Sequence, residues 1–272
     1  MRKILTSLLL LVAFSLFGAT HDAFANTNDS SKESLIENDE IFKKAVDLGL
    51  VNLESNGEII YLGDEKSLEI SSESYTEFLE KIESSNFLVG LKVAKVDNEY
   101  NIILLSSEEI ADVIYENDKK SKSNVNLDSS VTPFGIDPGL PTINLKSLVE
   151  SNKRELEDFY SAVLKTSPQT AYYAAVGYFV GKVREGGEWD YKIQPGYRYW
   201  YKEWTAYTYS GTRIINTEYI GNYNYAYVGE SLFSKNTLLI GGASVGAGVG
   251  QPEDDNDRQA IIEGFDDAVR YW

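Results

Sequence analysis

The segment from Gly187 to Lys192 (Gly-Glu-Trp-Asp-Tyr-Lys) places a carboxylate and an ammonium group two residues apart, between two large aromatic side chains. If the segment is extended, its side chains alternate, so Asp190 and Lys192 share one face while Trp189 and Tyr191 share the other. Such an arrangement can hold a charged pair at the mouth of a cleft with aromatic backing. The segment is therefore the first candidate for a site of chemistry.

The N-terminal residues have the form of a secretory signal peptide. Two basic residues precede an apolar run over residues 4–19, and an Ala-x-Ala cleavage site follows at residues 23–25. We expect residues 1–25 to be a signal peptide, the mature chain to begin at Asn26, and the protein to be secreted. No second apolar run is long enough to span a membrane, so no membrane span is expected after cleavage.

The mature chain is expected to contain neither histidine nor cysteine. The protein has no cysteine, and its single histidine, His21, precedes the cleavage site. This composition excludes disulfides, Ser-His-Asp triads, Cys-His pairs, and zinc sites with His or Cys ligands. Any chemistry must use carboxylates, Lys, Arg, Tyr, hydroxyls, amides or the backbone.

Charge and aromatic content divide the chain into two halves. The net charge is -17, and residues 26–140 hold 24 acidic against 10 basic residues, whereas residues 141–272 hold 17 against 13. All four Trp residues lie in the second half. We expect an α+β fold. The mature chain is expected to consist of a small acidic α+β module over residues 26–116, a linker over 117–141 and a helix-rich α+β domain over 142–272.

Hydrophobic periodicity and turn residues predict the elements of both halves. Residues 26–34 are polar and are expected to be disordered. The acidic module is expected to have helices over 36–50, 72–82 and 108–115, and strands over 58–62, 87–96 and 100–105. The second half is expected to have helices over 145–164, 168–180 and 258–271, and strands within 197–215 with a turn at Ser210-Gly211. The small-residue segment 238–250 fits either a buried helix or a Gly-rich loop.

Two further segments of the second half carry polar groups that could do chemistry. Asn222 and Asn224 lie between tyrosines and can present amides and phenols on common faces; a tight loop between strands is an equally good interpretation. The acidic run 253–257 precedes a helix, where carboxylates favour the positive end of the helix dipole. It could alternatively supply a catalytic carboxylate or hold a divalent cation at Asp254, Asp255 and Asp257; no other cofactor or metal is expected.

Taken together, these segments resemble the bacterial polymorphic toxin type 44 family over residues 185–272. The resemblance rests on Trp-Asp-Tyr-Lys at 189–192, Gly-Asn-Tyr-Asn-Tyr at 221–225, a small-residue segment, and the acidic run with Ile261 and Gly264. This chain differs from the family pattern at three positions, where Ala226 replaces Gly, Asn256 replaces Pro and Asn224 replaces the His of many members. The resemblance implies a secreted effector of bacterial competition that acts as a ribonuclease and has a cognate immunity or inhibitor protein.

The resemblance also supplies candidate site residues. The catalytic set that it implies is Asp190, Lys192, Asn222, Asn224, Tyr225 and Asp257. In a nuclease without histidine, Lys192 would stabilise the developing negative charge, and Asp190 or Asp257 would accept a proton. The expected substrate contacts are Trp189, Tyr191, Tyr223 and Asp255.

Two other functions remain open on the sequence. A cell-wall glycan (peptidoglycan) hydrolase needs only two carboxylates and aromatic platforms for sugars. In that case Glu188 or Asp190 would be the acid, with Asp255 or Asp257 as its partner. The chain could also be a catalytically inactive exported binding protein, an alternative that the differences at Ala226 and Asn256 keep open.

Overall fold

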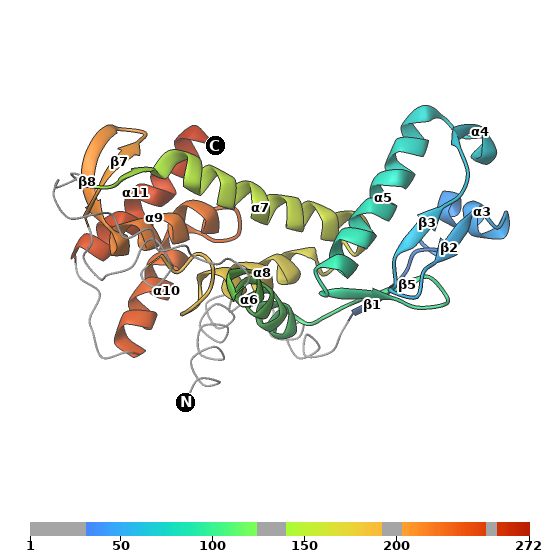
Figure 1. Ribbon diagram of the computed structural model, residues 1–272, viewed down its shortest axis with the longest axis horizontal. Coiled ribbons are helices and arrows are strands. Elements are labelled where there is room, and N and C mark those ends of the chain that lie inside the picture. Colours follow the sequence, from blue (N-terminus) through green and yellow to red (C-terminus); the bar gives the residue numbers. More distant parts are fainter. Residues whose placement is uncertain (1–30, 124–139, 192–202, 249–254) are drawn as a thin grey trace. The chain divides into compact units, whose positions relative to one another are not determined.

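The computed structural model describes residues 31–123, 140–191, 203–248 and 255–272. Helices dominate these residues and short strands complete them, which confirms the α+β class (Figure 1). The chain divides into two compact units, and neither is one continuous segment. Among the described residues, an N-terminal unit comprises 31–114 and 157–178, and a C-terminal unit comprises 115–156 and 179–272.

The N-terminal unit contains a three-stranded antiparallel sheet and a separate β-hairpin. The sheet has the order β1 (Ser31–Ser34), β5 (Asn101–Leu104) and β4 (Ala94–Val96), and the hairpin pairs β2 (Val51–Leu53) with β3 (Ile59–Tyr61). The predicted hairpin turn at Asp97-Asn98 joins β4 to β5 and is confirmed. For residues 31–34 the expectation of disorder is wrong. Strand β1 is wholly polar, so only its pairing with β5 identifies it as a strand.

The helices of this unit begin at capping side chains. Helix α3 (Glu40–Asp47) is shorter than predicted because Asp39 caps it, accepting hydrogen bonds from the backbone N–H groups of Ile41 and Phe42 at 2.9 and 3.0 Å. Asp64 caps the short helix α4 (Glu65–Leu68). Ser71 caps helix α5 (Ser72–Gly90).

Helix α5 continues eight residues past its predicted end, so the expected strand over 87–96 is wrong except for β4. Polar residues beyond the predicted end have hydrogen-bond partners that are compatible with a helix. The side-chain amide of Asn86 makes two hydrogen bonds to the backbone of Ile59 in β3: it accepts from the N–H at 2.7 Å and donates to the carbonyl at 2.8 Å. Ser85 is buried and donates to the carbonyl of Lys81, one turn earlier.

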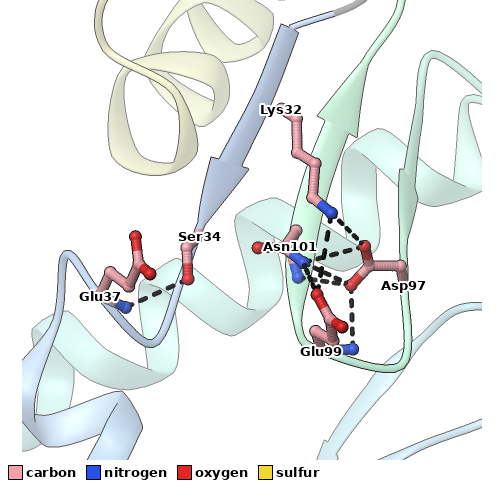
Figure 2. Close-up of polar contacts among 6 residues, drawn as sticks. All are labelled: Lys32, Ser34, Glu37, Asp97, Glu99 and Asn101. Atoms are coloured by element: carbon pink, nitrogen blue, oxygen red, sulfur yellow. Dashed lines mark hydrogen bonds and ion pairs between the residues drawn. The ribbon is translucent and has the colours of Figure 1, made fainter.

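Asp97 organises the β4–β5 turn and ties it to β1 (Figure 2). Its carboxylate accepts hydrogen bonds from the Asn101 backbone and side chain and from the Glu99 backbone, and it pairs with Lys32 of β1 at 3.0 Å. Burial on its own would raise the pKa of Asp97. The hydrogen bonds from Asn101, Lys32 and Glu99 outweigh burial and hold the pKa well below its usual range.

We predict that Asp97→Ala lowers the free energy of unfolding and reduces the dependence of this free energy on pH in the acidic range. A carboxyl group with a lowered pKa contributes stability above its unfolded pKa of about 4, and this contribution is lost as the pH falls through the folded value. Because the side chain is 29% exposed, we expect a loss of only about 1–2 kcal/mol at pH 7. Urea denaturation at pH 7 and pH 3 measures this effect; the loss should be smaller at pH 3, and an equal loss at both values would contradict it.

The C-terminal unit contains a mixed sheet with the order β6-β7-β8. Strand β6 (Thr142–Asn144) pairs in parallel with β7 (Glu203–Thr208), and β7 pairs antiparallel with β8 (Gly211–Asn216). The predicted turn at Ser210-Gly211 is confirmed, and Gly211 has the positive φ (121°) that this turn requires. The aromatic residues between 197 and 202 lie outside the described residues.

Three long helices carry residues of both units. They are α6 (Ser107–Ser123), α7 (Leu145–Thr166) and α8 (Ala171–Val183). The predicted helix over 145–164 is confirmed as α7, and the predicted apolar helix is confirmed as α8, although it starts three residues late. Residues 117–123 of the expected linker are helical in α6, and residues 124–139 lie outside the described residues.

The remaining helices of the C-terminal unit follow β8 directly: α9 (Thr217–Gly229), α10 (Lys235–Gly248) and α11 (Asp255–Tyr271). Figure 1 shows α9 beside α11. The alternating Tyr-Asn pattern suggested a loop between strands, and this interpretation of residues 220–229 is wrong. Asn216 caps the helix by accepting from the Tyr219 N–H at 2.8 Å, and Tyr219, Tyr223 and Tyr227 recur every four residues, which is a helical spacing.

Candidate functional site

Residues 187–191 form a series of turns and not a strand. The Asp190 carboxylate accepts a hydrogen bond from the Gly186 backbone N–H at 3.0 Å, and the Trp189 N–H donates to the Lys182 carbonyl at 2.9 Å. Trp189 and Tyr191 are buried, while Asp190 is half-buried. Half-buried and buried side chains therefore alternate from Glu188 to Tyr191, although the backbone forms turns and not a strand. Lys192 lies outside the described residues.

A buried amide links this turn to α9. Asn152 of α7 donates from Nδ2 to the Tyr191 hydroxyl at 2.6 Å and to Asn224 Oδ1 at 2.8 Å. Asn224 is completely buried, and its Nδ2 has no hydrogen-bond acceptor among the described residues. Two of the predicted site segments therefore meet through Asn152. Asn152 could not be identified from the sequence, because it is a single polar residue in a long amphipathic helix.

Asn222 faces a different neighbour. Two residues along a helix correspond to a rotation of about 200°, so Asn222 and Asn224 lie on opposite sides of α9. Asn222 donates from Nδ2 to the Asp257 carboxylate of α11 at 2.6 Å, and both side chains are half-buried. Asp255, one residue into α11, is exposed, and Asp254 lies outside the described residues. Two of the residues that the resemblance implies are thus in contact in the structure.

Next to Asn222, three groups meet that the sequence did not identify. Arg213 of β8 contacts Glu263 of α11 with Nη2 2.6 Å from Oε2, and the Tyr219 hydroxyl hydrogen-bonds to both. Arg213 and Glu263 are 34% and 30% exposed at their side chains, so solvent reaches this point. Tyr219 and Asn222 are three residues apart on α9, which makes them neighbours on its surface. No spacing rule links Arg213 to a glutamate 50 residues away, so only the fold reveals this group.

We call Arg213, Tyr219, Asn222, Asp257 and Glu263 the α9–α11 site. It combines one guanidinium group, one phenol, one amide and two carboxylates, all half-buried. Gln259 also donates to the second oxygen of Glu263 at 3.0 Å, which fixes the orientation of that carboxylate. Such a set can bind an anion, accept a proton and donate one.

The two other predicted tyrosines of α9 make hydrogen bonds to groups outside this site, although the Tyr223 ring stacks on that of Tyr219 with centroids 5.7 Å apart. Tyr223 is buried and donates to Asp267 at 2.6 Å. Burial, with the hydrogen bond to Asp267, raises the pKa of Tyr223 far above its usual value. The Tyr225 hydroxyl donates to the Leu238 carbonyl of α10 at 3.3 Å, and its ring packs against Phe179.

A second polar cluster surrounds the buried ammonium group of Lys182 on α8. Its Nζ lies 3.0 Å from Asp118 of α6 and 2.8 Å from Glu155 of α7, and it also hydrogen-bonds to Glu188. The Trp189 ring lies beside it, with Nζ 5.8 Å from the ring centroid. Burial, together with the Glu188 carboxylate, raises the pKa of Asp118 to about 6 against the lowering effect of Lys182.

We predict that Asp118 makes stability depend on pH between about 4 and 6. Because its folded pKa is raised, the folded state binds more protons, so this contribution is full below about pH 4 and is lost as the pH rises through about 6. From pH 5 to pH 7.5 the wild type should lose about 1–2 kcal/mol relative to Asp118→Asn, whose amide does not titrate. Urea denaturation of both proteins at the two pH values tests this, and parallel pH profiles would contradict it.

The described residues hold neither a ready-made metal site nor a membrane-spanning helix. In the described parts of the chain, no group of three or more acidic side chains is placed to hold a metal ion. The predicted cation site cannot be assembled from them, since Asp254 lies outside. Among the described helices, none is long and apolar enough to cross a membrane.

No family model, curated protein or solved structure matches this chain. The resemblance to polymorphic toxin type 44 therefore stays a prediction. The function is therefore inferred from the chemistry of the side chains that the fold brings together.

Proposed function

We propose that this chain is a secreted, toxin-like effector whose C-terminal unit cleaves the phosphodiester bonds of RNA without histidine. The observation that carries the proposal is the meeting of Arg213, Tyr219 and Glu263 at one half-exposed point beside the Asn222–Asp257 pair. A cationic group, a proton acceptor and a proton donor are the three parts that cleavage of a phosphodiester requires. Secretion rests on the predicted signal peptide.

The side chains have distinct roles in this mechanism. Glu263 accepts the proton of the attacking ribose hydroxyl, and Arg213 stabilises the negative charge that develops on the phosphate oxygens. The Tyr219 phenol gives its proton to the leaving oxygen. Because Tyr219 hydrogen-bonds directly to Glu263, the proton that Glu263 has taken up returns to the phenolate and the site is restored.

The neighbouring pair and the buried amides support this arrangement. Asp257 orients the Asn222 amide, whose remaining N–H and carbonyl can contact a base edge or a phosphate oxygen. The turn over residues 187–191 is held against the far side of α9. Asp190 stabilises the turn itself, and Tyr191 is linked to Asn224 of the helix through Asn152. A cognate inhibitor protein would be expected to cover the α9–α11 site.

One observation favours the alternative, a glycan hydrolase. Asp118, with its raised pKa, lies close to Glu188, and a protonated acid beside a carboxylate is what glycoside hydrolysis uses. Against it, Trp189 and Tyr191 are buried and offer no ring face to a sugar. We therefore place this function second.

The experiment uses the mature full chain with two substrates. With single-stranded RNA we expect cleavage that is lost in Arg213→Gln and kept in Arg258→Gln, a matched change of an exposed arginine on α11. With peptidoglycan we expect no released reducing sugar. Reducing sugar without RNA cleavage would support the glycan hydrolase, and inactivity on both would favour an exported binding protein and contradict the proposal.

A further inference from the structure

Five tyrosines of the C-terminal unit form a continuous stack. Tyr219, Tyr223 and Tyr227 follow one another along α9 with ring centroids 5.7 and 6.1 Å apart. Tyr209, after β7, continues the stack at 6.0 Å from Tyr227, and Tyr271 at the end of α11 stacks on Tyr209 at 4.4 Å. The last two contacts are nearly parallel, with interplanar angles of 9° and 3°.

Phenol groups of this stack donate hydrogen bonds to neighbouring carboxylate and hydroxyl oxygens. Tyr209 donates to the Glu150 carboxylate at 2.7 Å and lies 2.7 Å from the Tyr227 hydroxyl. Since Tyr209 uses its own proton for Glu150, Tyr227 must be the donor between the two phenols. Tyr223 likewise donates to Asp267. Burial, with the bonds to Glu150 and Tyr227, raises the pKa of Tyr209 far above its usual value, so the phenol stays protonated.

One end of the stack reaches solvent. Tyr271 is 47% exposed, while Tyr227 is fully buried and Tyr209 is half-buried. Tyr207 is exposed to the same degree, at 51%, but has no partner of this kind in the described residues. Among the described residues, Tyr207 and Tyr271 are thus exposed tyrosines of similar access, and Tyr271 stacks on Tyr209, a phenol that is hydrogen-bonded to a carboxylate.

We propose that Tyr209 is a one-electron oxidation site that an external oxidant reaches through Tyr271. An outer-sphere one-electron oxidant takes an electron from Tyr271. Tyr209 then transfers an electron to the oxidised Tyr271, whose ring centroid lies 4.4 Å from its own. The Tyr209 O–H bond breaks as the electron leaves, and its proton passes to the Glu150 carboxylate. The products are a neutral Tyr209 radical, a protonated Glu150 and the reduced oxidant, so electrons and protons balance.

Tyr209, Tyr219 and Tyr223 each donate to a carboxylate, and of these three it is Tyr209 that stacks directly on the exposed Tyr271. An oxidised phenol is a strong acid, so its oxidation is easiest where a base already accepts its hydrogen bond. The radical at Tyr209 would also be shielded from coupling with a second chain, because this side chain is half-buried and its ring packs against Tyr227 and Tyr271. This inference is independent of the proposed nuclease function, since neither Glu150 nor Tyr209 belongs to the α9–α11 site.

Photo-oxidation of the mature full chain tests the proposal. Tris(bipyridine)ruthenium(II) with persulfate generates the ruthenium(III) oxidant on illumination, and freezing followed by EPR spectroscopy measures the tyrosyl radical. We expect a long-lived radical in the wild type and in Tyr207→Phe. We expect a severalfold lower yield in Tyr209→Phe, Tyr271→Phe and Glu150→Gln.

Glu150→Gln is the decisive variant, because the amide can accept the hydrogen bond of Tyr209 but cannot take its proton. Its fold is checked by circular dichroism and by its urea midpoint, and all three Phe variants keep the aromatic ring. An equal radical yield in wild type and Glu150→Gln would overturn the proposal. So would a radical that disappears only in Tyr207→Phe.

Discussion

Replacing Glu263 by Gln is expected to lower kcat/KM for RNA cleavage by about 10²–10⁴-fold, the usual contribution of a positioned proton acceptor. The glutamine has nearly the same shape and can still accept hydrogen bonds from Tyr219 and Gln259. It cannot take the proton of the attacking hydroxyl or return one to the phenolate. Initial rates on a short RNA with one cleavable bond measure the effect, over a range of substrate concentrations.

The control for this prediction lies on the same helix. Asp266→Asn removes a carboxylate three residues away that pairs with Lys235 at the surface. Its side chain is 49% exposed, and we expect its kcat/KM to equal that of the wild type. If both variants lose activity equally, the loss reflects the charge of α11 and not proton transfer. If Glu263→Gln remains fully active, Glu263 is not the proton acceptor.

The elements that the sequence predicts well are those whose signals are local. Helix α7 has a long apolar stripe, and the β7–β8 turn has Ser210-Gly211, so both could be identified from neighbouring residues alone. Strand β1 has no apolar residue, and its strand character depends on pairing with β5. Helix α5 runs on because Asn86 finds a partner in β3, which is 27 residues away. Such long-range partners cannot be read from a local pattern.

The same distinction applies to the candidate site. Asn222 and Asp257 could be named from the resemblance, and they form a hydrogen bond in the structure. Arg213 and Glu263 have no local signal, because an isolated arginine in a strand and a glutamate on a helix are most often solvated surface residues. Their contact depends on how β8 delivers the chain into α9 and on how α11 packs across it.

That packing depends on one glycine of the predicted motif. Gly264 lies where α11 crosses α9, and a Cβ at this position would collide with the carbonyl oxygen of Tyr223. A backbone atom held in a helix cannot move aside as a flexible side chain could. The glycine therefore allows the two helices to approach closely enough for Asn222 to reach Asp257 and for Tyr219 to reach Glu263.

Gly264→Ala is accordingly expected to lower the free energy of unfolding by about 1–3 kcal/mol, the range for a core that must expand to admit a methyl group. The matched control is Gly221→Ala on the facing helix, where an added Cβ meets no atom within 4 Å. There alanine should stabilise by up to about 1 kcal/mol through its higher helix propensity. Urea denaturation followed by far-ultraviolet circular dichroism compares the two single-methyl additions. Opposite signs are expected because propensity favours alanine at both positions and only the helix crossing opposes it at Gly264; a stabilising Gly264→Ala would mean that α9 and α11 do not pack as described.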